Sequence, residues 1–218
     1  MFNELFILVI YLNAGVVIFI QKEDKMVWLE VETKVNVYNP KAMRARLQKI
    51  ARFVKKQTKG DDYFAVNIKG YPKKAFRIRN KPGEFEVNFK KWLKRCWSKD
   101  IVVKQEFEFK LKGREEVEDM LALFRDLGFE EWMKKRKYSE QYVWKKDKRV
   151  EIELNKVEHL GWYLEIEYLC QPHEIQTAKK KIRNVLKELE INPEHIDNTG
   201  YTRMLWDRGI KDKRYFIK

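Results

Sequence analysis

The sequence of 218 residues has few cysteines and few histidines, and those it has are not arranged as metal ligands. Cys96 and Cys170 lie far apart without a CxxC pair, which argues against a disulfide framework or a zinc site and favours a reducing, cytoplasmic location. His159, His173 and His195 form no HxxxH pair. Any bound metal is therefore expected to be a hard cation, Mg²⁺ or Mn²⁺, held by carboxylates.

Glycine and proline are also scarce, with 9 and 5 residues. The chain contains neither GxxxxGK nor GxGxxG, which excludes a phosphate site built from a glycine-rich backbone loop. Side chains would have to hold any bound phosphate. No linker rich in glycine, serine or proline divides the chain, so we expect residues 26–218 to form a single domain.

Charged residues are abundant, at 37% of the chain, and 47 Lys and Arg residues against 33 Asp and Glu residues give a net charge of +14. This excess predicts an anionic partner: a nucleic acid, an acidic membrane surface or a polyphosphate. The many acidic residues show that the chain is more than a basic arm for nucleic acid.

Residues 6–20 form the one long apolar run. As a helix this run would span about 22 Å, less than the roughly 30 Å of a membrane core, and it lacks the basic flank of a signal peptide. It could be a marginal membrane anchor, an extra buried segment, or the product of a start codon upstream of the native one. We favour the third interpretation, in which residues 1–25 are not part of the native protein and Met26 is its start.

Hydrophobic periodicity predicts two similar halves. In residues 27–35, Glu30, Glu32 and Lys34 alternate with apolar residues, as in a strand with two unlike faces. Asn39 and Pro40 are expected to begin a helix that runs to about Lys56 and is broken by residues 59–62. The other expected strands are 63–69, 75–79, 84–91, 102–111, 130–145, 149–157 and 162–169, and further helices are expected at 115–124, closed by Gly128, and from Pro172.

Two such βαββ-like halves favour an α+β fold, with a closed or nearly closed antiparallel β-barrel and helices packed outside. Nearly every expected strand has one charged and one apolar face. Charged faces turned to solvent would give an ordinary two-layer sandwich. Charged faces turned inward would give a polar lumen, and we favour the lumen because ExE pairs at both ends of the domain suit a metal, while the Arg pair between them suits phosphate oxygens.

The order of these motifs resembles the CYTH superfamily of triphosphate tunnel metalloenzymes, most of all its class IV adenylate cyclase and thiamine triphosphatase branch. The string from Glu30 to Lys34 matches the ExExK signature of that superfamily, and residues 154–167 are similar to its LDxVxxLGxFxEIE block. Residues 200–205 resemble a late Ser-Tyr-x-x-Leu-Leu element. Between them, the matching strings are Arg77 to Arg79, Asn88 to Lys90, Lys104 to Glu108 and Lys134 to Arg136.

The resemblance implies a tunnel that binds a triphosphate and a divalent cation, Mg²⁺ or Mn²⁺. The implied metal ligands or their neighbours are Glu30, Glu32, Glu153, Asn155, Glu165 and Glu167. The implied triphosphate-binding residues are Lys34, Arg77, Arg79, Lys90, Lys104, Lys134 and Arg136, and the implied catalytic residues are Glu30, Glu32, Lys34 and Arg136.

One departure from the superfamily pattern is Asn155, which stands where an Asp is usual. Its carbonyl oxygen can coordinate a metal, but the amide brings no charge. Glu153, two residues earlier on the same face, offers a replacement carboxylate. Without that replacement, metal affinity and turnover would be low, and the chain would bind a triphosphate better than it cleaves it.

The expected function is metal-dependent catalysis on ATP, thiamine triphosphate or tripolyphosphate, either cyclisation of ATP with release of pyrophosphate or hydrolysis. The alternative is a non-catalytic polyanion-binding or nucleic-acid-binding module that uses the net charge of +14. We regard nucleic acid as the less favoured partner, and expect no membrane partner unless residues 6–20 are genuine. The chain is expected to be a monomer or a homodimer.

Overall fold

The computed structural model describes residues 6–12, 15–21, 27–66 and 68–210. The barrel strands are β3 (Leu29–Asn36), β4 (Ala51–Val66), β5 (Ala75–Lys81), β6 (Glu84–Trp92), β7 (Val102–Leu111), β8 (Phe129–Trp144), β9 (Asp147–Val157) and β10 (Gly161–Cys170). The helices are α1 (Pro40–Ile50), α2 (Arg114–Asp126), α3 (Ile175–Glu188) and α4 (Tyr201–Asp207), with the short 3-10 helices η1 (Lys94–Cys96), η2 (Pro172–Glu174) and η3 (Pro193–His195).

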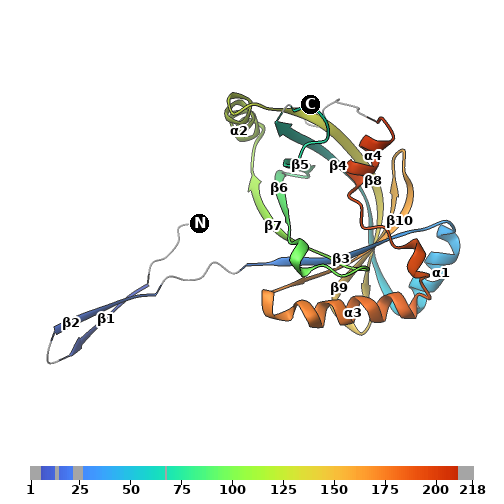
Figure 1. Ribbon diagram of the computed structural model, residues 1–218, viewed down its shortest axis with the longest axis horizontal. Coiled ribbons are helices and arrows are strands. Elements are labelled where there is room, and N and C mark those ends of the chain that lie inside the picture. Colours follow the sequence, from blue (N-terminus) through green and yellow to red (C-terminus); the bar gives the residue numbers. More distant parts are fainter. Residues whose placement is uncertain (1–5, 13–14, 22–26, 67, 211–218) are drawn as a thin grey trace.

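These strands form a closed antiparallel barrel in the order β10-β3-β7-β6-β5-β4-β8-β9, with the helices packed outside it (Figure 1). The predicted fold class is confirmed. Each half of the barrel is a βαβββ unit, β3-α1-β4-β5-β6 and then β7-α2-β8-β9-β10, with one strand more than the predicted βαββ unit. The halves are joined where β3 pairs with β7 and β10, where β6 pairs with β7, and where β4 pairs with β8.

The apolar faces of the strands point outward, toward the helices. α3 covers β10 and β3, where Ile182 packs in one cluster with Val31 and Ile166. A second cluster joins α2 to the strands around Ile78 and Val87. Because helices cover these apolar faces, the alternate residues of the same strands point into the barrel, where most of the charge lies.

The first helix begins as predicted but ends earlier. The side chain of Asn39 accepts a hydrogen bond from the backbone N–H of Ala42 at 3.0 Å, and Pro40 occupies the first turn. The helix ends at Ile50, and the prediction that it continues to Lys56 and is broken at residues 59–62 was wrong. Those residues belong to β4, which pairs with β8 along its length from Ala51 to Val66, and this ladder outweighs the helical spacing of the local sequence.

The second half follows the predicted pattern closely. β7 matches the expected strand 102–111, and α2 ends before Gly128, whose φ of 81° is the left-handed conformation expected after a helix. The final helix is preceded by the turn η2, so that its regular part begins at Ile175 rather than at Pro172.

The apolar N-terminal run contains strands rather than a helix. β1 (Phe6–Leu12) and β2 (Gly15–Gln21) pair as a separate antiparallel two-stranded sheet. Among the described residues, no helix is both long and apolar enough to cross a membrane. The proposed start at Met26 lies outside the described residues, and the division into residues 1–25 and a domain of residues 26–218 stays a prediction.

Candidate active site

The barrel lumen contains a cavity of about 850 Å³ whose walls are rich in charged side chains. The charged faces of the barrel strands therefore point inward. This arrangement excludes the two-layer sandwich, in which the charged faces would point to solvent. Its acidic lining residues are Glu30, Glu32, Glu86, Glu106, Glu108, Glu151, Glu153, Glu165 and Glu167. The basic lining residues contributed by barrel strands are Lys34, Lys59, Arg77, Arg79, Lys90, Lys104, Lys135 and Lys137.

Three of these carboxylates form a cluster at the junction of β3 and β10. Glu32 is paired across the strands with Glu167, and one oxygen each from Glu30, Glu32 and Glu167 lies within 4.8 Å of the others. Burial, helped by the negative charge of Glu30, raises the pKa of Glu32 to about 7 against the opposing effect of Lys104. Burial and the charges of Glu30 and Glu32 raise the pKa of Glu167 well above its usual value.

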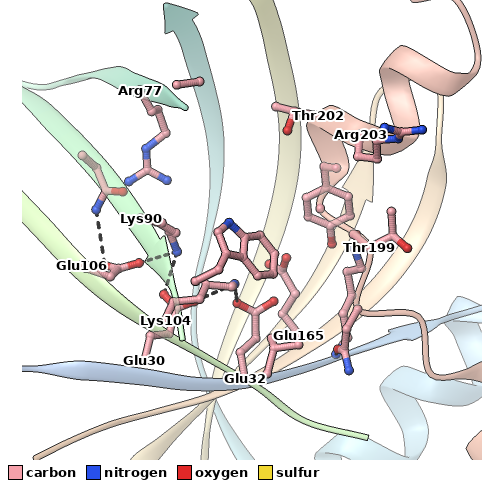
Figure 2. Close-up of a pocket in the computed structure, with 18 of the residues that line it drawn as sticks. Glu30, Glu32, Arg77, Lys90, Lys104, Glu106, Glu165, Thr199, Thr202 and Arg203 are labelled. Atoms are coloured by element: carbon pink, nitrogen blue, oxygen red, sulfur yellow. Dashed lines mark hydrogen bonds and ion pairs between the residues drawn. The ribbon is translucent and has the colours of Figure 1, made fainter. Parts of the chain in front are cut away.

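Two lysines lie against this cluster (Figure 2). Lys104 Nζ lies 2.9 Å from Glu30 Oε1 and also contacts Glu32, while Lys90 Nζ lies 2.7 Å from Glu30 Oε2 and also contacts Glu106. Burial would raise the pKa of Glu30, but the two ammonium groups outweigh it and hold that pKa well below its usual value. Glu30 is thus held ionised, whereas Glu32 and Glu167 are the carboxylates whose negative charge is least compensated.

A second ionic cluster crosses the lumen between β4, β5, β6 and β8. The buried Asp61 carboxylate accepts hydrogen bonds from Arg79 at 2.6 and 3.1 Å and lies 2.9 Å from Lys135 Nζ. Arg77 Nη2 donates to Glu86 at 2.6 Å, while the buried Nε of Arg77 has no hydrogen-bond partner. Burial would raise the pKa of Asp61, but Lys135 and Arg79 lower it well below its usual value.

A third cluster joins β4, β8, β9 and β10. Lys137 Nζ lies 2.9 Å from Glu153 and 2.8 Å from Glu165, and Lys59 also contacts Glu153. Asn155 is fully buried next to this third cluster and does not line the cavity. Its amide donates to Glu165 at 2.7 Å, and its oxygen accepts from Ser139, so Asn155 contacts a lumen carboxylate instead of facing the cavity.

Most of the sequence-predicted site residues line the lumen, and the exceptions are Asn155, Lys134 and Arg136. The basic residues of β8 that line the cavity are instead Lys135 and Lys137, which pair across the ladder with Asp61 and Lys59. Residues 134–137 are consecutively basic, and such a run carries no alternation from which the inward positions can be read. The sequence analysis also missed Asp61, because it interpreted residues 59–62 as a turn. These residues lie in β4, and in a strand the side chains of Lys59, Asp61 and Tyr63 point to the same face.

The C-terminal segment forms one wall of the cavity near Lys34. The Lys34 ammonium contacts the backbone carbonyl of Thr199 and lies 4.3 Å from the centre of the Tyr201 ring. Burial lowers the pKa of Lys34 to about 8, although Glu165 and Glu32 oppose the shift. Figure 2 shows Thr199, Thr202 and Arg203 on the side of the cavity opposite Lys90 and Glu106.

The carboxylate cluster fits a divalent cation. Glu30, Glu32 and Glu167 offer oxygen ligands from two adjacent strands, as Mg²⁺ and Mn²⁺ prefer. Burial, together with the neighbouring carboxylates, raises the pKa of Glu32 and of Glu167, and a bound cation would favour their ionised forms. Of the other predicted ligands, Glu153 and Glu165 bind Lys137, and Asn155 supports Glu165.

The fold is similar to that of several solved structures. A Pyrococcus horikoshii protein is 27% identical, with a TM-score of 0.65 over 82% of this chain and 99% of its own. A putative adenylate cyclase from Vibrio parahaemolyticus is 13% identical, with a TM-score of 0.61 over 82% of this chain and 98% of its own. A putative adenylyl cyclase from Hippeastrum, described as having a dominant triphosphatase activity, is 16% identical, with a TM-score of 0.57 over 88% of this chain and 99% of its own. No protein-family model matches this chain, and no curated protein matches it.

Proposed function

We propose that this chain, which has the fold of the CYTH superfamily that its sequence resembles, binds a triphosphate with a divalent cation in its lumen and cleaves a phosphoanhydride bond. The observation that carries the proposal is the presence of a three-carboxylate cluster and many basic side chains in one cavity. A module that only bound a nucleic-acid backbone would need the basic residues but would gain nothing from buried carboxylates beside them.

The basic residues would bind the phosphate oxygens. Arg77 is the clearest candidate, because its buried Nε is a donor without an acceptor and a phosphate oxygen would supply one. Asp61 holds Arg79 and Lys135 in place before any substrate arrives, which reduces the conformational entropy lost on binding. The remaining members of the proposed phosphate site are Lys34, Lys59, Lys90, Lys104 and Lys137.

Glu30, Glu32 and Glu167 would hold the cation. When bound, Mg²⁺ or Mn²⁺ would neutralise charge on the triphosphate and polarise its phosphorus–oxygen bonds. Lys104 touches both Glu30 and Glu32 and would fix the direction of their carboxylates. Glu153, Glu165 and Asn155 would act indirectly, by positioning Lys137 at the phosphate chain.

Two nucleophiles are compatible with this site. In hydrolysis, water attacks a phosphorus atom and orthophosphate or pyrophosphate leaves; in cyclisation, the ribose 3′-hydroxyl of ATP attacks the α-phosphorus and pyrophosphate leaves. In both reactions the fixed ammonium and guanidinium groups stabilise the negative charge that develops on the leaving phosphate. Aromatic side chains in the lining, including Tyr71 and Trp132, provide surfaces for the organic part of a substrate.

The proposal is tested by incubating the protein with tripolyphosphate, thiamine triphosphate or ATP in the presence of Mg²⁺ or Mn²⁺ and identifying the products. Parallel reactions contain EDTA. Orthophosphate, or pyrophosphate without cyclic AMP, identifies a phosphohydrolase, and cyclic AMP with pyrophosphate identifies a cyclase. Tight binding of all three compounds without any metal-dependent product would overturn the catalytic proposal and favour the polyanion-binding alternative.

A further inference from the structure

One edge of β7 is unpaired over the second half of the strand. On one side, β7 pairs with β6 from Lys104 to Leu111. On the other side it pairs with β3 only as far as Gln105, which lies opposite Leu29 at the start of that strand. Within the described part of the chain, no strand pairs with residues 106–111 on this second side (Figure 1). These residues form a free sheet edge, to which a further strand can be added.

The backbone of this free edge offers hydrogen bonds to such a strand. The carbonyl of Val103 accepts a hydrogen bond at 2.9 Å from the N–H of Leu93, which directly follows β6. In an antiparallel ladder the backbone groups of successive residues point to opposite sides of the strand. The N–H and C=O groups of Glu106, Glu108 and Lys110 therefore point away from β6, toward the free edge.

The side chains of the free edge alternate between apolar and charged residues. Phe107 and Phe109 lie on the outer face of the barrel and are 43% and 50% exposed. The ring of Phe107 lies 6.1 Å from that of Phe89 on β6. Glu108 and Lys110 lie on the other face and are also exposed. Large apolar side chains exposed along a free edge are typical of a surface that another chain covers.

The charges along the edge are arranged so that the strand is complementary to itself. Residues 106–112 read Glu-Phe-Glu-Phe-Lys-Leu-Lys, with both acids before Phe109 and both bases after it. Antiparallel pairing of two such strands about Phe109 places an acid opposite each base and an apolar residue opposite each apolar residue. A register centred on Glu108 would instead place two carboxylates opposite each other, so the pattern favours one register. The pairs in that register are Phe109 with Phe109, Glu108 with Lys110, Phe107 with Leu111 and Glu106 with Lys112.

We propose that the free edge of β7 binds the same edge of a second copy of this chain, so that the two barrels share a continuous antiparallel sheet. A twofold axis passes through the central Phe109 pair, and every other contact then occurs twice. Glu108 and Lys110 exchange backbone hydrogen bonds across the new ladder as well as a side-chain ion pair. A strand of unrelated sequence could bind the same backbone but would not match the order of the charges. The inference does not depend on the chemistry of the lumen.

The first test uses the full chain without any substitution. Sedimentation equilibrium over a range of concentrations should show a reversible association whose mass approaches twice the 26.6 kDa of one chain. Amide hydrogen exchange at Glu108 and Lys110 should slow as the fraction of dimer rises, because these amides become paired. A chain that stays monomeric, or a dimer in which these two amides are unprotected, would overturn the proposal.

An exchange of charges tests the register. Glu108→Lys and Lys110→Glu each place like charges opposite each other and are each expected to weaken the dimer roughly tenfold. The double substitution restores opposite charges and should return the dissociation constant to within about threefold of the wild type. Glu194→Lys, the same reversal on an exposed residue of η3, should change it less than about twofold. Failure of the double substitution to recover dimerisation would contradict the proposed pairing.

A matched pair of apolar substitutions tests the centre of the interface. Phe109→Ser removes the aromatic pair on the twofold axis and is expected to weaken the dimer at least roughly tenfold. Leu123→Ser makes a similar change at an exposed residue of α2 and should change the dissociation constant less than about twofold. Both side chains are exposed, so both variants should keep the fold, which circular dichroism checks. Equal effects of the two substitutions would show that general surface hydrophobicity drives association and would overturn the proposal.

Discussion

Glu30 has the most connected carboxylate of the proposed metal site, with Lys104 at 2.9 Å and Lys90 at 2.7 Å. Glu30→Gln is expected to lower metal-dependent cleavage by on the order of 100-fold or more, since it removes an anionic ligand at nearly constant shape. Steady-state kinetics at several metal concentrations measure this loss. Glu118→Gln, on the exposed face of α2, is the control, and activity of Glu30→Gln at the wild-type level would remove Glu30 from the site.

The two faces of β8 predict opposite behaviour for neighbouring lysines. Lys135 lines the lumen and lies 2.9 Å from Asp61, so Lys135→Ala is expected to raise KM for the triphosphate roughly tenfold. Lys134→Ala makes the same change one residue away, outside the cavity lining, and KM should change less than about twofold. A larger effect of Lys134→Ala than of Lys135→Ala on KM would contradict this assignment. It would favour Lys134 and Arg136, which the sequence resemblance implied, as the triphosphate-binding residues of β8.

Glu32 gives a prediction for pH. Its pKa is raised from 4.5 to about 7 by burial and by Glu30, so between these values the folded protein keeps a proton that the unfolded chain has released. The unfolded state then binds fewer protons, and stability falls as pH rises through this window. Urea titrations in EDTA should therefore show the stability of the wild type decreasing relative to Glu32→Gln from about pH 4.5 to about pH 7. A constant difference across that window would contradict the raised pKa.

At the scale of single elements, the start of α1 is the most direct test of local structure. Asn39 accepts from the Ala42 N–H at 3.0 Å, and Asn39→Ala should reduce the free energy of unfolding by about 1 kcal/mol. Asn39→Asp keeps the acceptor and should be nearly neutral. Urea denaturation checks both substitutions, and equal losses would mean that the cap contributes nothing specific.

The elements themselves were largely predictable from the sequence. β3, β7 and α2 follow from alternation, helical spacing and the glycine after the helix, signals that depend on a few neighbouring residues. β4 could not be predicted in this way, because the apolar residues of its first half recur at helical spacing. Its extended conformation is imposed by pairing with β8, which lies more than 60 residues away in the chain. A ladder between distant segments is a tertiary interaction, and a local pattern cannot report it.

The site was predictable where a strand alternates and unpredictable elsewhere. Glu30, Glu32 and Glu167 occupy alternating strands, and all three lie in the carboxylate cluster. Asp61 depends on recognising β4, and Lys135 depends on choosing one face within a run of four basic residues. The places of Glu153 and Asn155 relative to the proposed metal site depend on side-chain contacts across β8, β9 and β10, which the sequence of one strand does not encode.

For the whole molecule, the net charge of +14 predicts non-specific attraction to nucleic acids. Because this attraction is shared among many surface charges, it should weaken steeply as salt is raised and should not require a metal. Cleavage of tripolyphosphate, which depends on buried groups, should be less sensitive to salt. Filter binding of duplex DNA and a cleavage assay over the same salt series compare the two. Parallel salt dependence would place the catalytic charges at the surface.

The closure of the barrel also constrains when the protein can fold during its synthesis. β3 pairs with β7 and with β10, from Leu29 opposite Cys170 to Asn36 opposite Tyr163. The first barrel strand therefore has no partner until the second half of the domain emerges from the ribosome. Until then, its alternating apolar face and unpaired backbone are accessible to other nascent chains, to chaperones and to proteases. Folding should be slow and should be completed only after β10 is available.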